Sequence, residues 1–146
     1  MGIKKILIVD DEKTMCAMIA KFLRSSGYDC ESTNDSVMGL RMLDKEKFDI
    51  VISDIKMPHM DGLKLLGRIR ERHPEADVIM ITGFADDYSY SDIIKAGAAD
   101  FIEKPFNLAE LKAKIERVSR EHFMQEQLQG LQLSRFPSLS PPFLNL

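Results

Sequence analysis

The apolar residues along the chain follow two alternating patterns. Short continuous apolar runs, typical of strands buried on both faces, come between longer segments whose apolar residues recur at helical spacing. Strands are predicted over residues 4–9, 28–33, 48–53, 76–82 and 100–103, and helices over residues 13–26, 35–45, 62–72, 87–96 and from 108 onward. Parallel strands need crossover connections, which are usually helices. The alternation therefore predicts an α/β fold with a doubly wound, five-stranded parallel sheet.

Glycines and a capping pattern mark several of the predicted helix ends. Gly27 and Gly97 directly follow two of the helical patterns, and Asn107 precedes Glu110 by three residues in an arrangement like a capping box. Gly39 is a local conflict, because a glycine inside a helix costs about 1 kcal/mol relative to alanine. We assign Gly39 to close packing.

The last helical pattern continues beyond the length that a compact domain needs. Its apolar stripe, from Leu108 to Val118, is followed by helix formers with further spaced apolar side chains. After Ser134 the composition changes to Pro, Ser, Leu and Phe. We expect a domain over residues 1–120, a helical linker extension over 121–133 and a disordered tail over 134–146.

The composition narrows the classes of function. The chain has 20 basic and 23 acidic side chains, a net charge of −3, and 45% apolar residues, which suffice for one core. A chain with this slight excess of acidic side chains lacks the broad basic surface that would bind nucleic acid unaided. Apolar runs such as residues 6–9 are far shorter than the roughly 20 residues of a membrane span. Because the first residues lack a signal-peptide pattern, we expect a cytoplasmic location, with reduced thiols at Cys16 and Cys30.

Polar residues follow the predicted strands, where an open parallel sheet has its working crevice. They are Asp10, Asp11, Asp54, Thr82 and Lys104. If the first and third strands are neighbours, their ends lie about 4.8 Å apart, which gathers three carboxylates into one crevice. Such a cluster either raises one pKa or holds a cation. Mg²⁺ fits, because it prefers oxygen ligands and reaches out to phosphate oxygens.

This set of side chains suits phosphoryl chemistry. With a metal held by Asp10 and Asp11, the carboxylate of Asp54 is free to act as a nucleophile that forms an aspartyl phosphate. The ammonium of Lys104 and the hydroxyl of Thr82 can then neutralise phosphoryl oxygens together with the metal.

Five motifs in order resemble the receiver domain of two-component response regulators. They are Asp10-Asp11 and the segments 53–62, 81–83, 96–101 and 104–106. The resemblance covers roughly residues 3–120. It implies a flavodoxin-like receiver fold with strand order 2-1-3-4-5 and a cis peptide bond before Pro105.

The resemblance also implies a role for each site residue. Asp54 becomes the phosphoacceptor, Thr82 and Lys104 its phosphoryl partners, and Phe101 the aromatic side chain that switches. Mg²⁺ becomes the cofactor, and its protein ligands are the carboxylates of Asp10, Asp11 and Asp54 and the backbone carbonyl of Lys56.

Two departures from the commonest pattern of the family concern the switch and the lifetime of the phosphorylated state. Phe101 stands where many members carry Tyr, so a switch step that needs a phenol hydroxyl is not expected. Phe84 and Lys56 stand where the attacking water passes in the family, and we expect slowed autodephosphorylation.

The resemblance implies a signalling domain whose only chemistry is its own phosphorylation and autodephosphorylation, rather than an enzyme with turnover. A sensor histidine kinase or phosphotransfer protein would phosphorylate Asp54. We expect phosphorylation to switch a binding or dimerisation face, with the extended final helix adding to a homodimer contact, and to control an output such as transcription. No membrane and no direct nucleic acid partner is expected for these residues.

Three other functions are alternatives to a receiver domain. An aspartyl-phosphate phosphohydrolase usually has a second carboxylate two residues after the nucleophile, where this chain has Lys56. A flavin-binding protein would need a phosphate loop where residues 10–12 would repel phosphate. An adaptor that ignores phosphorylation stays open, although no acidic pocket residue is lost. His59, His73 and His122 lack metal-ligand spacing and are interpreted as solvated.

Overall fold

A computed structural model describes residues 5–83 and 88–135, with side chains up to Gly130. Strands and helices alternate along the described residues, as the hydrophobic pattern predicts. The strands are β1 Lys5–Val9, β2 Asp29–Thr33, β3 Ile50–Asp54, β4 Asp77–Thr82 and β5 Asp100–Glu103. The helices are α1 Lys13–Ser25, α2 Ser36–Lys45, α3 Gly62–Arg72, α4 Tyr90–Lys95 and α5 Leu108–Arg135.

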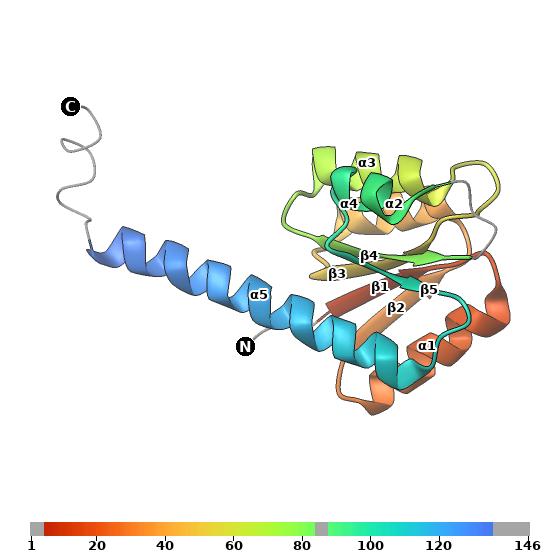
Figure 1. The fold of residues 1–146 in the computed structure, drawn as a ribbon, viewed down its shortest axis with the longest axis horizontal. Helices are drawn as coiled ribbons and strands as arrows, with labels where there is room; N and C mark the ends of the chain where they lie inside the picture. Colours follow the sequence, from red (N-terminus) through yellow and green to blue (C-terminus); the bar gives the residue numbers. More distant parts are fainter. Residues whose placement is uncertain (1–4, 84–87, 136–146) are drawn as a thin grey trace.

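The strands form one sheet that helices cover on both faces. The sheet is parallel throughout and has the order β2-β1-β3-β4-β5, which confirms the predicted fold class and strand order. Helices α1 and α5 lie on one face, and α2, α3 and α4 lie on the other (Figure 1). The predicted cis peptide bond between Lys104 and Pro105 is present.

The central strand β1 shows why its sequence has no polar alternation. Ile6 and Ile8 pack into the core beneath α1 and α5, whereas Leu7 and Val9 pack into the core beneath α2, α3 and α4. All four side chains are fully buried. A strand covered on both faces needs a continuous apolar run, because successive side chains point to opposite faces.

Two of the sequence predictions concern the start of α4 and the packing of Gly39 inside α2. Helix α4 begins at Tyr90, later than predicted, because Ser89 and Asp92 form a reciprocal capping box that starts the helix there. The predicted start at Asp87 lies outside the described residues. Close packing at Gly39 is confirmed, since a Cβ there would lie 3.0 Å from the Cγ2 atom of Val9.

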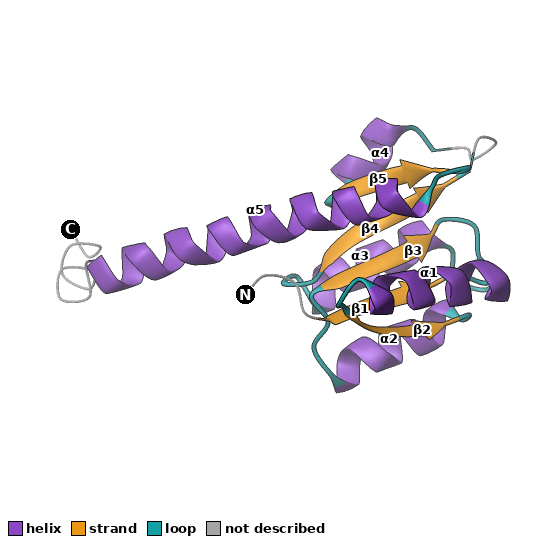
Figure 2. Cartoon of the chain, turned by 90° about the horizontal axis from the view of Figure 1, so that it is seen from below, coloured by secondary structure: helices purple, strands orange, loops and turns teal. Residues whose placement is uncertain are grey.

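Helix α5 runs without a break through the predicted domain boundary at residue 120. Leu111, Ile115 and Val118 are buried against the sheet, and the helix then extends beyond the rest of the fold (Figures 1 and 2). Met124 and Leu128 on this extension are 63% and 59% exposed. Of the predicted tail, residues 136–146 lie outside the described residues. None of the described helices is both long and apolar enough to cross a membrane.

The interpretation of the histidines as solvated is wrong for two of them. The His122 ring bonds the carboxylates of Asp77 and Glu126, each at 3.0 Å. The Nε2 atom of His73 lies 2.8 Å from the Asp44 carboxylate. Spacing along the sequence could not reveal these pairs, because the Asp77 and Asp44 carboxylates come from distant segments.

Candidate functional site

Three carboxylates meet at the carboxyl end of the sheet. Asp10 and Asp11 directly follow β1, and Asp54 is the last residue of β3, the strand paired with β1. One carboxylate oxygen from each of the three lies within 4.8 Å of the others. The structure therefore brings together the acids that the strand-end rule selects.

Asp10 is the most enclosed of these acids. Its side chain is fully buried, and its Oδ1 atom accepts a hydrogen bond of 2.9 Å from the backbone N–H of Glu12. Its Oδ2 atom is buried without a hydrogen-bond partner among the described residues. Burial, together with the nearby Asp54 carboxylate, raises the pKa of Asp10 to about 6. A buried oxygen without a partner beside two further carboxylates fits a hard cation with oxygen ligands.

Asp54 and Lys104 form an ion pair at the centre of the site. The Lys104 Nζ atom lies 3.3 Å from the Asp54 Oδ2 atom, and Asp54 is only 5% exposed. Burial raises the pKa of Asp54, although Lys104 opposes the shift. Burial by itself would lower the pKa of Lys104, but the carboxylates of Asp54 and Asp10 outweigh it and raise that pKa. The ammonium is therefore charged and faces the carboxylate.

Thr82 is the last residue of β4, and Phe101 lies on the neighbouring strand β5. Thr82 is 2% exposed, and its hydroxyl lies 3.5 Å from the backbone carbonyl of Ile102. The half-buried Phe101 ring stacks on Tyr90, with 4.2 Å between the ring centroids and 14° between the ring planes. Sequence analysis missed Tyr90, because only the placement of α4 against β5 brings the two rings together.

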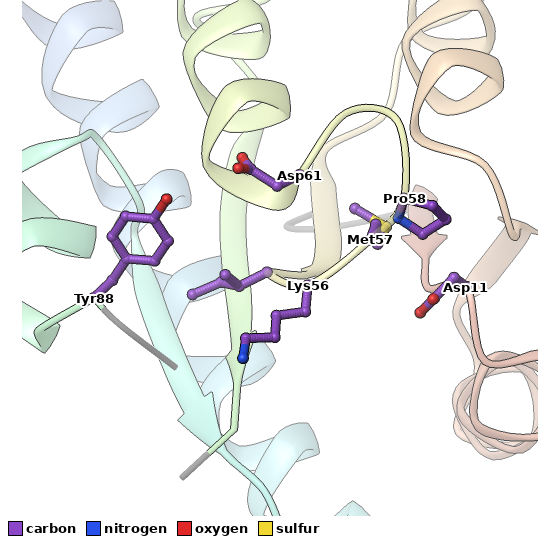
Figure 3. A pocket seen from close by; sticks show the side chains of 7 residues that line it. Asp11, Lys56, Met57, Pro58, Asp61 and Tyr88 are labelled. Carbon is purple, nitrogen blue, oxygen red and sulfur yellow. The ribbon is translucent and has the colours of Figure 1, made fainter. Parts of the chain in front are cut away.

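A cavity of about 430 Å³ opens beside the carboxylates. Figure 3 shows Tyr88 and Asp11 on opposite sides of it, with Lys56 between them. The cavity is lined by Asp11, Ile55, Lys56, Met57, Pro58, Asp61 and Tyr88. It leaves room next to Asp11 for part of a second molecule. Phe84, the other predicted neighbour of the water route, lies outside the described residues.

Two polar side chains near the site were also missed by sequence analysis. Asn34 donates to the backbone carbonyl of Asp10, and Ser36 donates to the backbone carbonyl of Met60. Bonds from side chains to backbone carbonyls have no residue pattern of their own, so no sequence signal could have singled them out.

The sequence of this chain is similar to those of known proteins. A sequence model described as the response regulator receiver domain matches residues 6–116. The DNA-binding transcriptional regulator NtrC of Escherichia coli K12 is 33% identical over 129 residues, which are 88% of this chain and 28% of the relative. The alkaline phosphatase synthesis transcriptional regulatory protein PhoP of Bacillus subtilis 168 is 29% identical, and the match covers 80% of this chain and 49% of PhoP.

Solved structures agree with these sequence matches. A response regulator receiver domain protein from Clostridium thermocellum has a TM-score of 0.79 at 30% identity, covering 84% of this chain and 98% of that one. The receiver domain of NtrX from Brucella abortus has a TM-score of 0.74 at 34% identity, covering 79% and 98%. The chain thus spans nearly all of each receiver structure but about a quarter of NtrC and half of PhoP.

Proposed function

The chain belongs to the family of response regulator receiver domains of two-component systems, and we propose that it accepts a phosphoryl group on Asp54. The observation that carries this proposal is the placement of the Asp54 carboxylate. It lies 3.3 Å from the Lys104 ammonium on one side and beside the carboxylates of Asp10 and Asp11 on the other. A nucleophilic carboxylate needs such a cation close by, because the transferred group brings negative charge.

In the proposed reaction, an oxygen of the Asp54 carboxylate attacks the phosphorus atom of a donor. The new O–P bond forms as the bond between phosphorus and the donor's leaving atom breaks, and the leaving atom keeps the electron pair and takes up a proton. The Lys104 ammonium and the Thr82 hydroxyl then donate to phosphoryl oxygens. The donor is a phosphohistidine of a sensor histidine kinase or phosphotransfer protein. In autodephosphorylation, water attacks the same phosphorus atom, the O–P bond to Asp54 breaks, and inorganic phosphate leaves as the carboxylate is restored.

The residues present fit Mg²⁺ as the cofactor of this reaction. The carboxylates of Asp10, Asp11 and Asp54 and the backbone carbonyl of Lys56 would hold it. The buried Asp10 Oδ2 atom without a partner among the described residues supports this assignment. When bound, Mg²⁺ supplies positive charge that offsets the charge on the phosphoryl oxygens.

Phosphorylation is proposed to act on the face formed by α4, β5 and α5. A Thr82 hydroxyl drawn toward a phosphoryl oxygen leaves its place near Ile102, and Phe101 then shifts from its stack on Tyr90 into the space behind it. A typical coupling of about 1 to 3 kcal/mol would change the affinity of a homodimer by roughly 5 to 150-fold. Sedimentation with and without beryllofluoride and Mg²⁺ measures this change.

We propose that the output controlled by phosphorylation is transcription. Curated relatives such as NtrC and PhoP are described as transcriptional regulators. An adaptor that ignores phosphorylation and a phosphohydrolase are not favoured, because Lys104 and Thr82 lie at the same edge of the sheet as the three acids, and Lys56 stands where a hydrolase has its second carboxylate.

Labelling with acetyl phosphate and Mg²⁺ tests the acceptor directly. Intact-mass spectrometry should detect one added phosphoryl group on the parent and none on Asp54→Asn, because an amide is not a competent nucleophile. Asp100→Asn is the matched control, since Asp100 is buried to a similar degree, 6% exposed, and begins β5, two strands away from β3 in the sheet. It should be labelled like the parent. Labelling of Asp54→Asn at the parent level would place the acceptor elsewhere, and an unlabelled parent would support the adaptor.

A further inference from the structure

The segment from Thr33 to Ser36, which joins β2 to α2, holds the backbone of Asp10 through two hydrogen bonds. The Asp10 N–H donates to the carbonyl of Thr33 at 3.2 Å, and the Asn34 Nδ2 atom donates to the carbonyl of Asp10 at 2.9 Å. The Asp10 carbonyl belongs to the same peptide unit as the Asp11 N–H. The two bonds therefore hold the peptide units on either side of Asp10, and the bond from Asn34 holds the one that separates the Asp10 and Asp11 carboxylates.

The same connection also reaches the loop after β3. Ser36 is 1% exposed, and its hydroxyl donates to the carbonyl of Met60 at 2.7 Å. The Met60 N–H donates to the carbonyl of Pro58 at 2.8 Å, and the Gly62 N–H donates to the carbonyl of Ile55 at 2.7 Å. The loop thus folds back on itself and is attached to α2 at Met60.

This loop has a backbone that needs outside support. His59 has a φ of 69°, a region that non-glycine residues populate sparsely and keep only when their surroundings hold them there. A Cβ at Gly62 would lie 2.2 Å from the carbonyl oxygen of Asp54, so the loop returns directly onto the residue that carries the third carboxylate. The hydrogen bond from the buried Ser36 side chain holds Met60, the residue that directly follows His59.

We propose that Asn34 and Ser36 are positioning residues of the Mg²⁺ pocket, one for each of the two loops that carry its ligands. This inference rests on the proposed metal site. Both side chains donate to backbone carbonyls, so they act through the loops that carry the ligands. Their own segment is held in place because α2 packs closely on β1, where Gly39 approaches Val9. A pocket held in its binding geometry loses less conformational freedom when the cation binds.

Titration of Mg²⁺ by calorimetry or NMR tests the proposal with two variants. Ser36→Ala should weaken Mg²⁺ binding about 10-fold, the lower end of the effect of removing an outer-shell partner. Asn34→Ala should weaken it less, because Asn34 is exposed and water can replace its bond. Ser26→Ala is the matched control. It removes a comparable bond from a serine hydroxyl to a carbonyl, that of Phe22 at 3.0 Å, at the end of α1, and should bind Mg²⁺ like the parent.

Thermal unfolding in EDTA, measured on the same variants, separates positioning from ordinary stability. A purely structural role would lower the melting temperature and leave the affinity for Mg²⁺ unchanged, which would overturn the proposal. If Ser36→Ala does not fold, Asn34→Ala decides alone, and parental affinity in that variant overturns it. A parent that binds no Mg²⁺ would overturn the metal site itself. Parental affinity in both variants, with binding lost in Asp10→Asn, would overturn only the role of Asn34 and Ser36.

Discussion

The acids at the amino ends of β4 and β5 and the acids at the carboxyl ends of β1 and β3 have different partners. At the amino end, Asp77 begins β4 and bonds His122 of α5 at 3.0 Å. Asp100 begins β5 and is paired with Lys114 at 3.5 Å and, more closely, with Arg117. At the carboxyl end, three carboxylates face one another, and one of the Asp10 oxygens lacks a partner among the described residues. The acids that begin β4 and β5 therefore have basic partners from α5, whereas the acids at the carboxyl end lie close together and leave one buried oxygen that suits a cation.

The largest difference between the two groups of acids is expected in Mg²⁺ binding. Asp10→Asn and Asp11→Asn should each weaken Mg²⁺ binding by more than about 100-fold, beyond the range for outer-shell partners, because each removes a proposed ligand. Asp100→Asn, at the start of β5, should leave the affinity unchanged. Calorimetric titration measures all three, and parental affinity in both pocket variants would remove these carboxylates from the metal site.

Removing a charge from the pocket should stabilise the Mg²⁺-free protein. Burial raises the pKa of Asp10 from 3.8 to about 6, so its ionised form lowers the free energy of unfolding above about pH 6. Asp10→Asn should raise that free energy by about 2 to 3 kcal/mol at pH 7 in EDTA, because the neighbouring carboxylates can accept from the amide.

This gain should disappear as the pH falls toward 4. The folded parent binds a proton on Asp10 in this range before the unfolded chain does, so the parent recovers the lost stability. Urea unfolding at pH 7 and pH 4 measures the difference. A parent and variant of equal stability at both pH values would show that ionised Asp10 is not destabilising.

The opposite sign is expected for the acid that begins β5. Arg117→Met should lower the free energy of unfolding by about 1 to 2 kcal/mol, because the buried Asp100 carboxylate loses a charged donor and keeps Lys114. Arg120→Met, at an exposed position of the same helix, is the control. Urea unfolding at pH 7 measures both, and a stabilised Arg117→Met would remove the contrast between the two ends.

The smallest effect is expected where α5 leaves the sheet. His122→Ala should cost less than about 1 kcal/mol, since its pairs with Asp77 and Glu126 are partly exposed. Its local effect should be faster hydrogen exchange in α5 after residue 120, because the helix loses its bond to the start of β4. Gln125→Ala, on the exposed part of the helix, should leave the exchange unchanged. Equal exchange in all three proteins would mean that His122 does not anchor the helix.

The sequence predicted which side chains gather at the carboxyl end of the sheet better than it predicted the side chains that support them. The spacing of hydrophobic residues located the strands, which are recognisable from local patterns. Asp10, Asp54 and Lys104 were then selected because binding sites of open parallel sheets lie at the carboxyl ends of the strands. Strand order came from the resemblance to a family. Ser36 and His122 were missed because Met60 and Asp77, which they contact, lie in distant segments of the chain.

The unbroken course of α5 means that its length determines the direction in which anything joined to it faces. Each residue of an α-helix turns the next by about 100° and advances it by about 1.5 Å. The stretch from Ser119 to Arg135 therefore acts as a lever of roughly 24 Å, whose far end moves about 2 Å for each 5° of tilt at the sheet. Inserting one residue would rotate an attached domain by about 100°, whereas inserting seven would nearly restore its original phase.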